Sequence, residues 1–241
     1  MEQNVISNPP LGLLLVIAAD AMNGSYALPM KKTPRWAFEN AWLVYSVVAM
    51  LALNWSIALV TVPHLLAVYA RAGITPVLMA FTFGDRIKQE AIASGAASGA
   101  DSDAIWALAL LGSFFVNVIY CAILLTRNAT WARFREKGTA SHWLLAGLMG
   151  VIWMFSITLC GRGASLMGPL GGSVGWAVFY CCIIIFSTFW GIVSGEWREG
   201  QGRPLRTLYA GLAVLAVAIV ILGYGNRLPT LNRGNWRRPE T

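Results

Sequence analysis

Charged side chains are scarce in this chain of 241 residues: Asp, Glu, Lys and Arg together make up 12% of it, against 57% apolar residues. A soluble domain carries about 25% charged residues, because polar side chains have to cover its surface. Half of that share leaves most of the surface apolar, which suits lipid better than water. The composition therefore excludes a soluble globular domain and predicts an integral membrane protein in contact with the lipid bilayer.

Residues that build metal and nucleophilic sites are scarce as well. The chain has two histidines, His64 and His142, and its four cysteines lie inside apolar runs without a CxxC pair. It has no P-loop, HExxH, GxSxG or dinucleotide-binding motif. We therefore expect no catalytic residue, no metal and no cofactor, and a protein that is not an enzyme. The net charge is +7, but it forms short clusters rather than a long basic stripe, so nucleic acid is not an expected partner.

Long apolar runs dominate what is present. A membrane-spanning helix needs about 20 mostly apolar residues, and its backbone groups must be paired internally in hydrocarbon. Runs of this kind cover 11–30, 37–62, 104–126, 142–166, 170–195 and 205–225. The predicted fold class is all-α: a polytopic transmembrane helix bundle of about six spans. Residues 1–225 form a single transmembrane domain, and 226–241 form a basic tail.

The segment 64–84 is ambiguous, because Arg71, Gly73 and Pro76 interrupt it. Basic residues gather after the first run, after 104–126 and before the last run, and cytoplasmic loops collect such residues. All of these loops are cytoplasmic if the N-terminus is outside and 64–84 does not cross completely, being half-inserted or at the interface. We therefore predict a multi-pass protein of the inner (plasma) membrane with its N-terminus outside. The arginine-rich tail then ends outside, against the rule.

Polar residues inside the apolar runs are the candidates for function, because burying them in lipid costs free energy. Asp20 lies midway along the first run and is the candidate for accepting a coupling proton; the alternative is a neutral carboxyl without a transport role. Arg162 lies between two glycines near the end of 142–166. It could bind a sugar hydroxyl or pair with Asp20, or extend to the lipid headgroups instead.

A second group of candidates could line a polar cavity. Ser113, Asn117 and Tyr120 share one face of a helix by their spacing, although such a stripe can equally hold two helices together. Tryptophans can stack on the apolar face of a sugar ring, but most of the eleven are expected in packing or in interfacial belts. The substrate-cavity candidates are Tyr26, Trp42, Asn54, Asn117, Tyr120, Trp153, Arg162 and Trp176.

Glycines also recur at the spacing of helix-packing motifs. Gly171 and Gly175, and again Gly191 and Gly195, are four residues apart. Such pairs let two helices approach closely, so we interpret them as packing residues rather than as part of a site.

Two stretches resemble the L-rhamnose–proton symporter family of the drug/metabolite transporter superfamily. The first is NGSYALPMKK at 23–32, followed by the pattern W-x-x-E-N-x-W at 36–42, which resembles the end of the family's first helix and the start of its second. The second stretch contains Met167-Gly168-Pro169, Ser173, Gly175-Trp176, Gly191, Gly195-Glu196-Trp197 and Arg203-Pro204. It resembles the family's penultimate helix with its terminal G-E-W.

The resemblance implies a ten-helix fold of two inverted five-helix repeats, with a 6-deoxy sugar and a proton sharing a cavity between the halves. Residues 1–70 resemble the first two family helices, and 75–225 resemble the C-terminal repeat. The family's third to fifth helices and much of its sixth are then missing around Arg71–Pro76. The chain is thus expected to be an incomplete version of the ten-helix inverted-repeat transporter.

The resulting prediction is a secondary transporter of a sugar, L-rhamnose or another 6-deoxyhexose, taken up with protons. Such transporters bind substrate at the interface of their repeats, so losing most of one repeat removes about half of the cavity wall. The alternative is a transport-inactive truncated protein, or a subunit that pairs with another copy as a homodimer or with a different partner. An unfilled groove beside the first two helices, lined by small residues, would favour that alternative. Clustering of Glu39, His142 and Glu196 would favour an enzyme.

Overall fold

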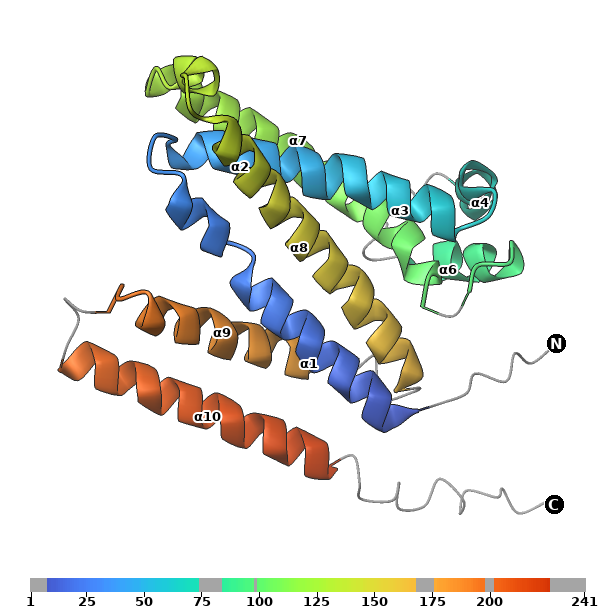
Figure 1. Ribbon diagram of the computed structural model, residues 1–241. Coiled ribbons are helices and arrows are strands. Elements are labelled where there is room, and N and C mark those ends of the chain that lie inside the picture. Colours follow the sequence, from blue (N-terminus) through green and yellow to red (C-terminus); the bar gives the residue numbers. More distant parts are fainter. Residues whose placement is uncertain (1–7, 74–83, 98, 168–175, 198–201, 226–241) are drawn as a thin grey trace, which may run out of the picture.

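The computed structural model describes residues 8–73, 84–97, 99–167, 176–197 and 202–225, and every regular element within these ranges is helical (Figure 1). The elements are α1 (Pro9–Ser25), η1 (Leu28–Lys32), α2 (Phe38–Ser46), η2 (Val47–Leu53), α3 (Asn54–Thr61), α4 (Leu65–Ala72), α6 (Gly84–Ala93), α7 (Asp101–Arg127), η3 (Trp131–Arg135), α8 (Ala140–Leu166), α9 (Trp176–Val193) and α10 (Arg203–Gly225). The basic tail 226–241 and the glycines at 171 and 175 lie outside the described residues.

Among the described residues, five helical segments are long and apolar enough to cross a membrane: Pro9–Lys32, Phe38–Thr61, Asp101–Arg127, Ala140–Leu166 and Pro204–Ile221. The shorter apolar helix Val178–Val193 lies within α9. The five long segments coincide with predicted runs to within four residues, and Val178–Val193 lies inside the predicted run 170–195. The predicted all-α bundle of about six spans is confirmed, and the chain is an integral multi-pass membrane protein.

The helix α8 lies at the centre of the bundle (Figure 1). On one side it packs against α1, which in turn packs against α9. On its other side it packs against the second span, formed by α2, η2 and α3, which also contacts α7. The last helix, α10, has its main contact with α9 and lies at the edge of the bundle. Among the described spans, each therefore has its main contacts with one or two others, and much apolar surface is left for lipid.

Glycines bring α1 close to its two neighbours. A Cβ atom on Gly12 would lie 2.6 Å from the Gly163 carbonyl oxygen on α8, and a Cβ on Gly163 would lie 2.8 Å from the Gly12 carbonyl oxygen. A Cβ on Gly24 would lie 2.6 Å from the Cβ of Phe186 on α9. Close backbone approach of this kind replaces the hydrophobic effect as a packing force in lipid.

Gly191 and Gly195 were predicted to pack α9 against another helix, and the structure gives them a different role. A Cβ on Gly191 would lie 3.0 Å from Oε2 of Glu196, which belongs to the turn that follows the same helix. Gly195 has a φ of 80°, a backbone conformation that glycine adopts at the end of a helix without strain. This pair therefore ends α9 rather than packing it against another helix.

The second span contains a wide helical turn in its middle. Residues of η2 form a π-helix between the α-helical pieces α2 and α3. Asn54 follows this turn directly and is 1% exposed; its Nδ2 donates to the carbonyl oxygens of Met50 (3.3 Å) and Trp106 (3.0 Å). A π-turn shifts the helical register by one residue, and here it coincides with a side-chain bond from the second span to α7.

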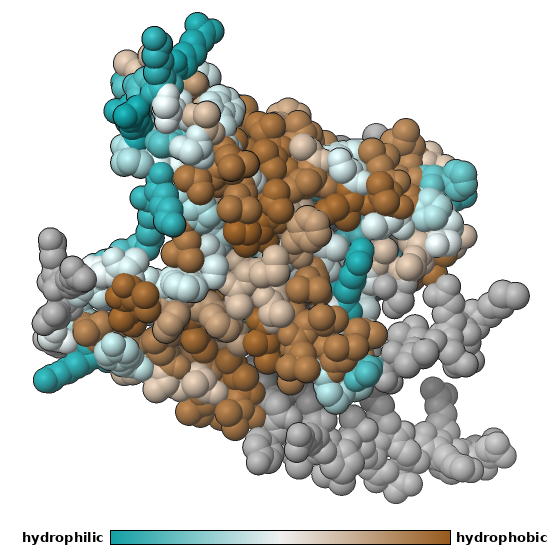
Figure 2. Space-filling model, viewed as in Figure 1, coloured by the Kyte–Doolittle hydropathy of each residue, from teal (hydrophilic) through white to brown (hydrophobic). Residues whose placement is uncertain are grey.

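The basic loops meet at one end of the bundle. The guanidinium of Arg35 donates to the carbonyl oxygen of Lys137 at 2.7 Å. The ammonium of Lys31 pairs with Glu196 at 2.5 Å, so the turn after α9 joins the loop after α1. Figure 2 shows an apolar band across the middle of this face, with hydrophilic residues gathered toward the ends. One basic end and an apolar middle are the distribution expected of a protein oriented in a membrane.

The segment that follows the second span stays at the end of the bundle where α3 ends and α7 begins. The hydroxyl of Thr61, at the end of α3, donates to Oδ2 of Asp103 in the first turn of α7 (2.9 Å). The hydroxyl of Tyr69 on α4 donates to the carbonyl oxygen of Ala104 (2.8 Å), and burial raises the pKa of Tyr69 above its ordinary value. Because α4 spans only Leu65–Ala72, the described part of 64–84 does not cross, as the basic-loop pattern requires. Residues 74–83 lie outside the described residues.

Candidate functional site

Asp20 lies where α1, α8 and α9 meet, and its side chain is fully buried. The apolar cluster around it contains Val16 and Ala19 of its own helix and the half-buried Cys182 of α9. In the described part of the chain, its carboxyl oxygens have no hydrogen-bond donor stronger than the thiol of Cys182 on α9. The thiols of Cys160 on α8 and Cys182 are its polar neighbours. Because a buried charge without a partner is costly, this site suits a carboxyl group that carries a proton.

A pair of polar residues lies one helical turn further along α1. Nδ2 of Asn23 donates to the hydroxyl of Ser156 on α8 at 2.8 Å, and both side chains are buried. The hydroxyl of Ser156 also donates to the carbonyl oxygen of Trp153. The sequence interpretation missed this pair, although the three-residue spacing of Asp20 and Asn23 does place both on one face of a helix.

Aromatic side chains form a cluster beside this polar face. The ring of Tyr45 lies 5.4 Å from Tyr26, 4.9 Å from Trp42 and 5.9 Å from Trp153, measured between ring centres. Tyr45 is almost completely buried. Three cavity candidates, Tyr26, Trp42 and Trp153, are therefore brought together by α1, the second span and α8. Tyr45, at the centre of the cluster, was not among the candidates.

Two asparagine candidates adjoin the aromatic cluster. Nε1 of Trp42 donates to Oδ1 of Asn117 on α7 at 2.9 Å, and Nδ2 of Asn117 donates to the Ser113 carbonyl oxygen at 2.9 Å. The Oδ1 atom of Asn54 is buried and has no hydrogen-bond partner among the described residues. An unpartnered buried acceptor is uncommon, and a ligand hydroxyl would satisfy it.

The remaining candidates lie elsewhere. Tyr120 is 55% exposed on the outer face of α7, and the side chain of Trp176 lies outside the described residues. Arg162 is exposed and lines a separate cavity of about 330 Å³ together with Thr61 and Thr158. The acidic residue with which it interacts electrostatically is Asp103, not Asp20. The structure thus brings Tyr26, Trp42, Trp153 and Asn117 together, places Asn54 beside Met50 and Trp106, and leaves Tyr120 and Arg162 apart from them.

The residues named for an enzyme site have separate partners. Oε1 of Glu39 accepts from Asn128 and Thr130, whereas Glu196 pairs with Lys31. The ring of His142 packs edge-on against Trp36. No group of three or more metal-ligating side chains occurs within the described ranges. The arrangement around Asp20 can instead hold a proton beside aromatic faces and amide groups.

Comparison with known proteins identifies a family that part of this chain resembles. The family model described as the L-rhamnose-proton symport protein matches residues 4–100. An L-rhamnose-proton symporter from Citrobacter koseri is 22% identical over 119 residues, which are 47% of this chain and 35% of that protein. The chain thus matches about a third of the length of this relative, and no solved structure matches. The correspondence of residues 75–225 to the C-terminal repeat stays a prediction. The comparisons confirm the resemblance to the L-rhamnose–proton symporter family, and Asp20, Tyr26, Trp42 and Asn54 lie in the matched part.

Proposed function

We propose that this protein is a secondary transporter of the inner membrane that takes up a 6-deoxyhexose, most simply L-rhamnose, together with protons. The observation that carries the proposal is the fully buried carboxyl of Asp20 at the junction of α1, α8 and α9, where the described residues offer it no stronger donor than the thiol of Cys182. The resemblance to proton symporters over residues 4–100 supports it.

Protonation of Asp20 provides a physical basis for coupling. With a proton bound, the side chain is neutral and the three helices can pack around it as the structure shows. Without the proton, the carboxylate needs water or a polar partner, because a charge in hydrocarbon costs about 2.5–3.5 kcal/mol or more. Loss of the proton therefore favours an arrangement in which the junction is open to water on one side.

The aromatic cluster and the amides supply the groups that a sugar needs. Tyr26, Trp42 and Trp153 can stack on apolar ring faces and on the methyl group of a 6-deoxy sugar. Asn54 and Asn117 can bond hydroxyl groups, and Oδ1 of Asn54 has no hydrogen-bond partner among the residues that the structure describes. In this structure the aromatic rings pack against one another, so sugar binding requires them to separate.

A groove lies beside the second span, between Leu43–Val48, the η3 turn and Trp143, with a volume of about 760 Å³. A groove in this place was the predicted mark of a subunit that needs a partner. Its walls carry aromatic and branched side chains, however, instead of the small residues expected for helix packing. The alternative, a transport-inactive subunit, is therefore kept behind the symporter.

Uptake into proteoliposomes tests the proposal. Radiolabelled L-rhamnose uptake by the purified chain is expected to rise with an inward proton gradient. Asp20→Asn should remove the effect of the gradient while the protein still inserts, because the amide is neutral and similar in size. Asp85→Asn is the matched control, since Asp85 is exposed in the first turn of α6.

The outcomes are distinct. A dependence on the gradient that survives in Asp20→Asn would remove Asp20 from coupling. Absence of uptake by correctly inserted, folded wild-type protein would refute transport by this chain alone and favour the subunit function. Equal losses in Asp20→Asn and Asp85→Asn would point to a general effect of reduced negative charge.

A further inference from the structure

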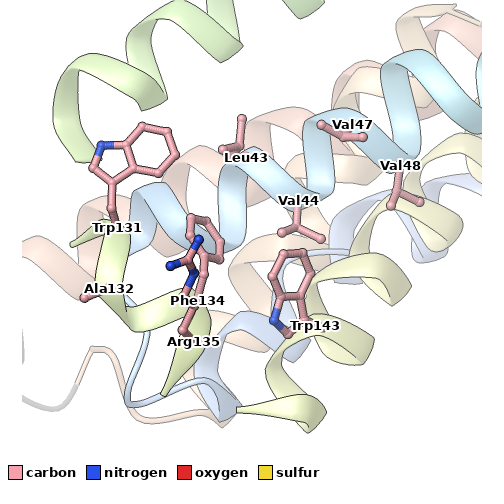
Figure 3. A pocket seen from close by; sticks show the side chains of 9 residues that line it. All are labelled: Leu43, Val44, Val47, Val48, Trp131, Ala132, Phe134, Arg135 and Trp143. Carbon is pink, nitrogen blue, oxygen red and sulfur yellow. The ribbon is translucent and has the colours of Figure 1, made fainter. Parts of the chain in front are cut away.

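The groove beside the second span has two unlike parts (Figure 3). One wall is aliphatic and is formed by Val44, Val47 and Val48. The opposite wall is formed by the η3 turn, Trp131–Arg135, and Trp143 of α8 closes one side. Of the described residues that line the groove, Arg135 is the charged one. A deep apolar wall with one cation at its edge is the shape of a site for an amphiphile with an anionic head.

Arg135 is free to bind an anion. It is exposed, and it makes no hydrogen bond or ion pair with any residue that the structure describes. The neighbouring guanidiniums are differently placed, because Arg35 donates to the Lys137 carbonyl oxygen and Arg133 donates to the Arg35 carbonyl oxygen. Arg135 is therefore the guanidinium of this loop region whose donors remain available beside the groove.

The position of the groove in the bundle indicates which layer of the membrane it faces. It lies at the end where the basic loops meet, next to the loop 127–140, and its valine wall continues along the second span. Trp131 and Trp143 at its margins are each about half exposed, as is usual for tryptophans at the boundary between headgroups and hydrocarbon. The groove thus runs from headgroup level into the hydrocarbon.

We propose that this groove binds an anionic phospholipid, with its phosphate on the guanidinium of Arg135 and an acyl chain along Val44, Val47 and Val48. A guanidinium matches a phosphate with two parallel hydrogen bonds. Basic pockets between membrane helices on the cytoplasmic side are suited to anionic headgroups. The aliphatic wall excludes water in the same way as hydrocarbon does.

Other occupants fit the groove less well. The aliphatic wall of the groove offers few groups that could form hydrogen bonds with the hydroxyls of a sugar. A second copy of the chain would have to present a carboxylate to Arg135, or leave its charge buried without a partner at considerable cost. A single phospholipid can place an acyl chain on the aliphatic wall and its phosphate on Arg135.

Native mass spectrometry of the detergent-purified full chain can test this site. The protein is titrated with dioleoyl phosphatidylglycerol and, separately, with dioleoyl phosphatidylcholine. We expect tighter binding of phosphatidylglycerol. In Arg135→Gln this affinity should fall about fivefold, the loss expected for one basic residue near an anionic lipid, while phosphatidylcholine binding stays unchanged. Lys137→Gln is the matched control, because its exposed side chain does not line the groove.

A second variant tests the acyl-chain wall without changing charge. Val47→Trp fills the groove from a position that is 40% exposed, so it should fold while weakening the binding of both lipids. Thermal melting of each variant shows that it is folded. Equal affinities for the two lipids, or equal losses in Arg135→Gln and Lys137→Gln, would overturn the proposal. A dimer that Val47→Trp separates while lipid binding persists would place a second copy in the groove instead.

Discussion

The contact between Gly12 on α1 and Gly163 on α8 allows a sharp test of the packing. A Cβ added at Gly163 would lie 2.8 Å from the Gly12 carbonyl oxygen, 3.0 Å from Cγ2 of Val16 and 3.1 Å from the Cβ of Leu15. Backbone and Cβ atoms cannot move aside as the end of a long side chain can. The helices themselves must separate if residue 163 is an alanine.

The magnitude of the effect follows from this geometry. Ordinary contact begins near 3.4 Å, so α1 and α8 would move apart by roughly half an ångström, enough to forfeit about a quarter of the dispersion energy of the contacts affected. Overpacking of this kind costs about 1–3 kcal/mol. Alanine regains at most about 1 kcal/mol through its higher helix propensity. The expected net loss for Gly163→Ala is about 1–2 kcal/mol.

Gly147 provides the matched control, because it lies on the same helix and a Cβ there would meet nothing within 4 Å. Gly147→Ala should leave stability unchanged or raise it slightly. The free energy of unfolding can be measured in mixed micelles with increasing dodecyl sulfate, followed by the loss of helical circular dichroism. If Gly163→Ala were as stable as Gly147→Ala, the close packing of α1 on α8 would be refuted.

Two further predictions concern the contact between α1 and α8 and the orientation of the bundle. A double-mutant cycle of Asn23→Ala and Ser156→Ala should give a coupling of about 0.6 kcal/mol and at most about 1.7 kcal/mol, the average and the maximum measured for bonds between membrane helices; a coupling of zero would contradict the buried 2.8 Å bond. With the N-terminus outside, an impermeant maleimide should label Ala93→Cys in intact spheroplasts but label Lys137→Cys only after permeabilisation, with the unsubstituted protein as blank. Labelling of both from one side would overturn the topology.

The helices were predictable because lipid imposes a simple rule on length and composition. The run 11–30 nevertheless contains a break, since α1 ends at Ser25 and η1 begins at Leu28 with Pro29 in its first turn. A proline removes a backbone donor and ends the preceding helix. The π-turn η2 is another feature that hydropathy cannot reveal, because its residues are as apolar as those around them.

The start of α7 shows a different limit of the sequence interpretation. The apolar run begins at residue 104, whereas the helix begins at Asp101. Acidic residues are favoured in the first turn of a helix, and Oδ1 of Asp101 accepts from the backbone nitrogen of Gly99 at 3.0 Å. Asp103 was missed as a buried residue for the same reason: it looks like part of a polar loop until Thr61 is placed against it.

The candidate site was predictable in its residue types but not in its pairings. Asp20 stood out because a carboxyl within an apolar run is costly. Its helix neighbour Asn23 bonds to Ser156, which is 133 residues away, and no local pattern specifies that distance. Helical periodicity likewise predicts that Asn117 and Tyr120 lie on one face of their helix, but it does not predict which way this face points. In the structure Asn117 is half-buried, whereas Tyr120 is 55% exposed.

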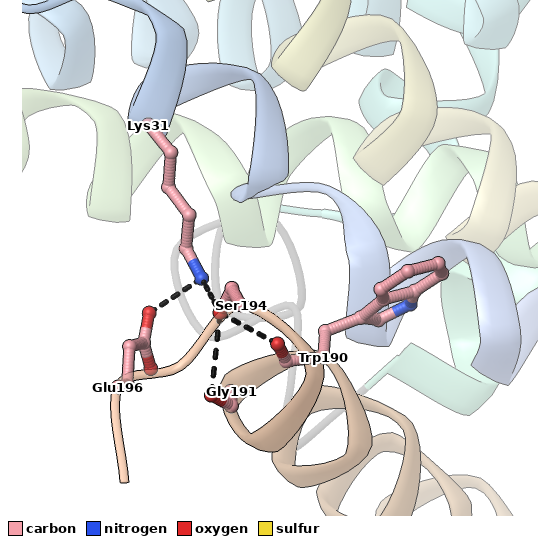
Figure 4. A network of polar contacts seen from close by, with 5 residues as sticks. All are labelled: Lys31, Trp190, Gly191, Ser194 and Glu196. Atoms are coloured by element: carbon pink, nitrogen blue, oxygen red, sulfur yellow. Dashed lines mark hydrogen bonds and ion pairs between the residues drawn. The ribbon is translucent and has the colours of Figure 1, made fainter. Parts of the chain in front are cut away.

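The network at the basic end has a clear geometry (Figure 4). The ammonium of Lys31 donates to the hydroxyl of Ser194 and pairs with Glu196, two residues that follow α9. The hydroxyl of Ser194 donates to the carbonyl oxygens of Trp190 and Gly191. Lys31 and Glu196 are both exposed, so the ion pair contributes little stability, about 1 kcal/mol or less. Lys31 and Glu196 come from the two stretches singled out in the sequence, so their ion pair joins these stretches in the structure.

The packing of α1 also has a consequence for the order in which the chain is made. The helix α1, which carries Asp20, is made before the helices that enclose this residue, α8 and α9, which begin at Ala140 and Trp176. Until α8 and α9 have been made, Asp20 lacks the neighbours that these two helices supply. Enclosure of the Asp20 carboxyl is therefore a late step, because it needs α8 and α9 to pack against α1.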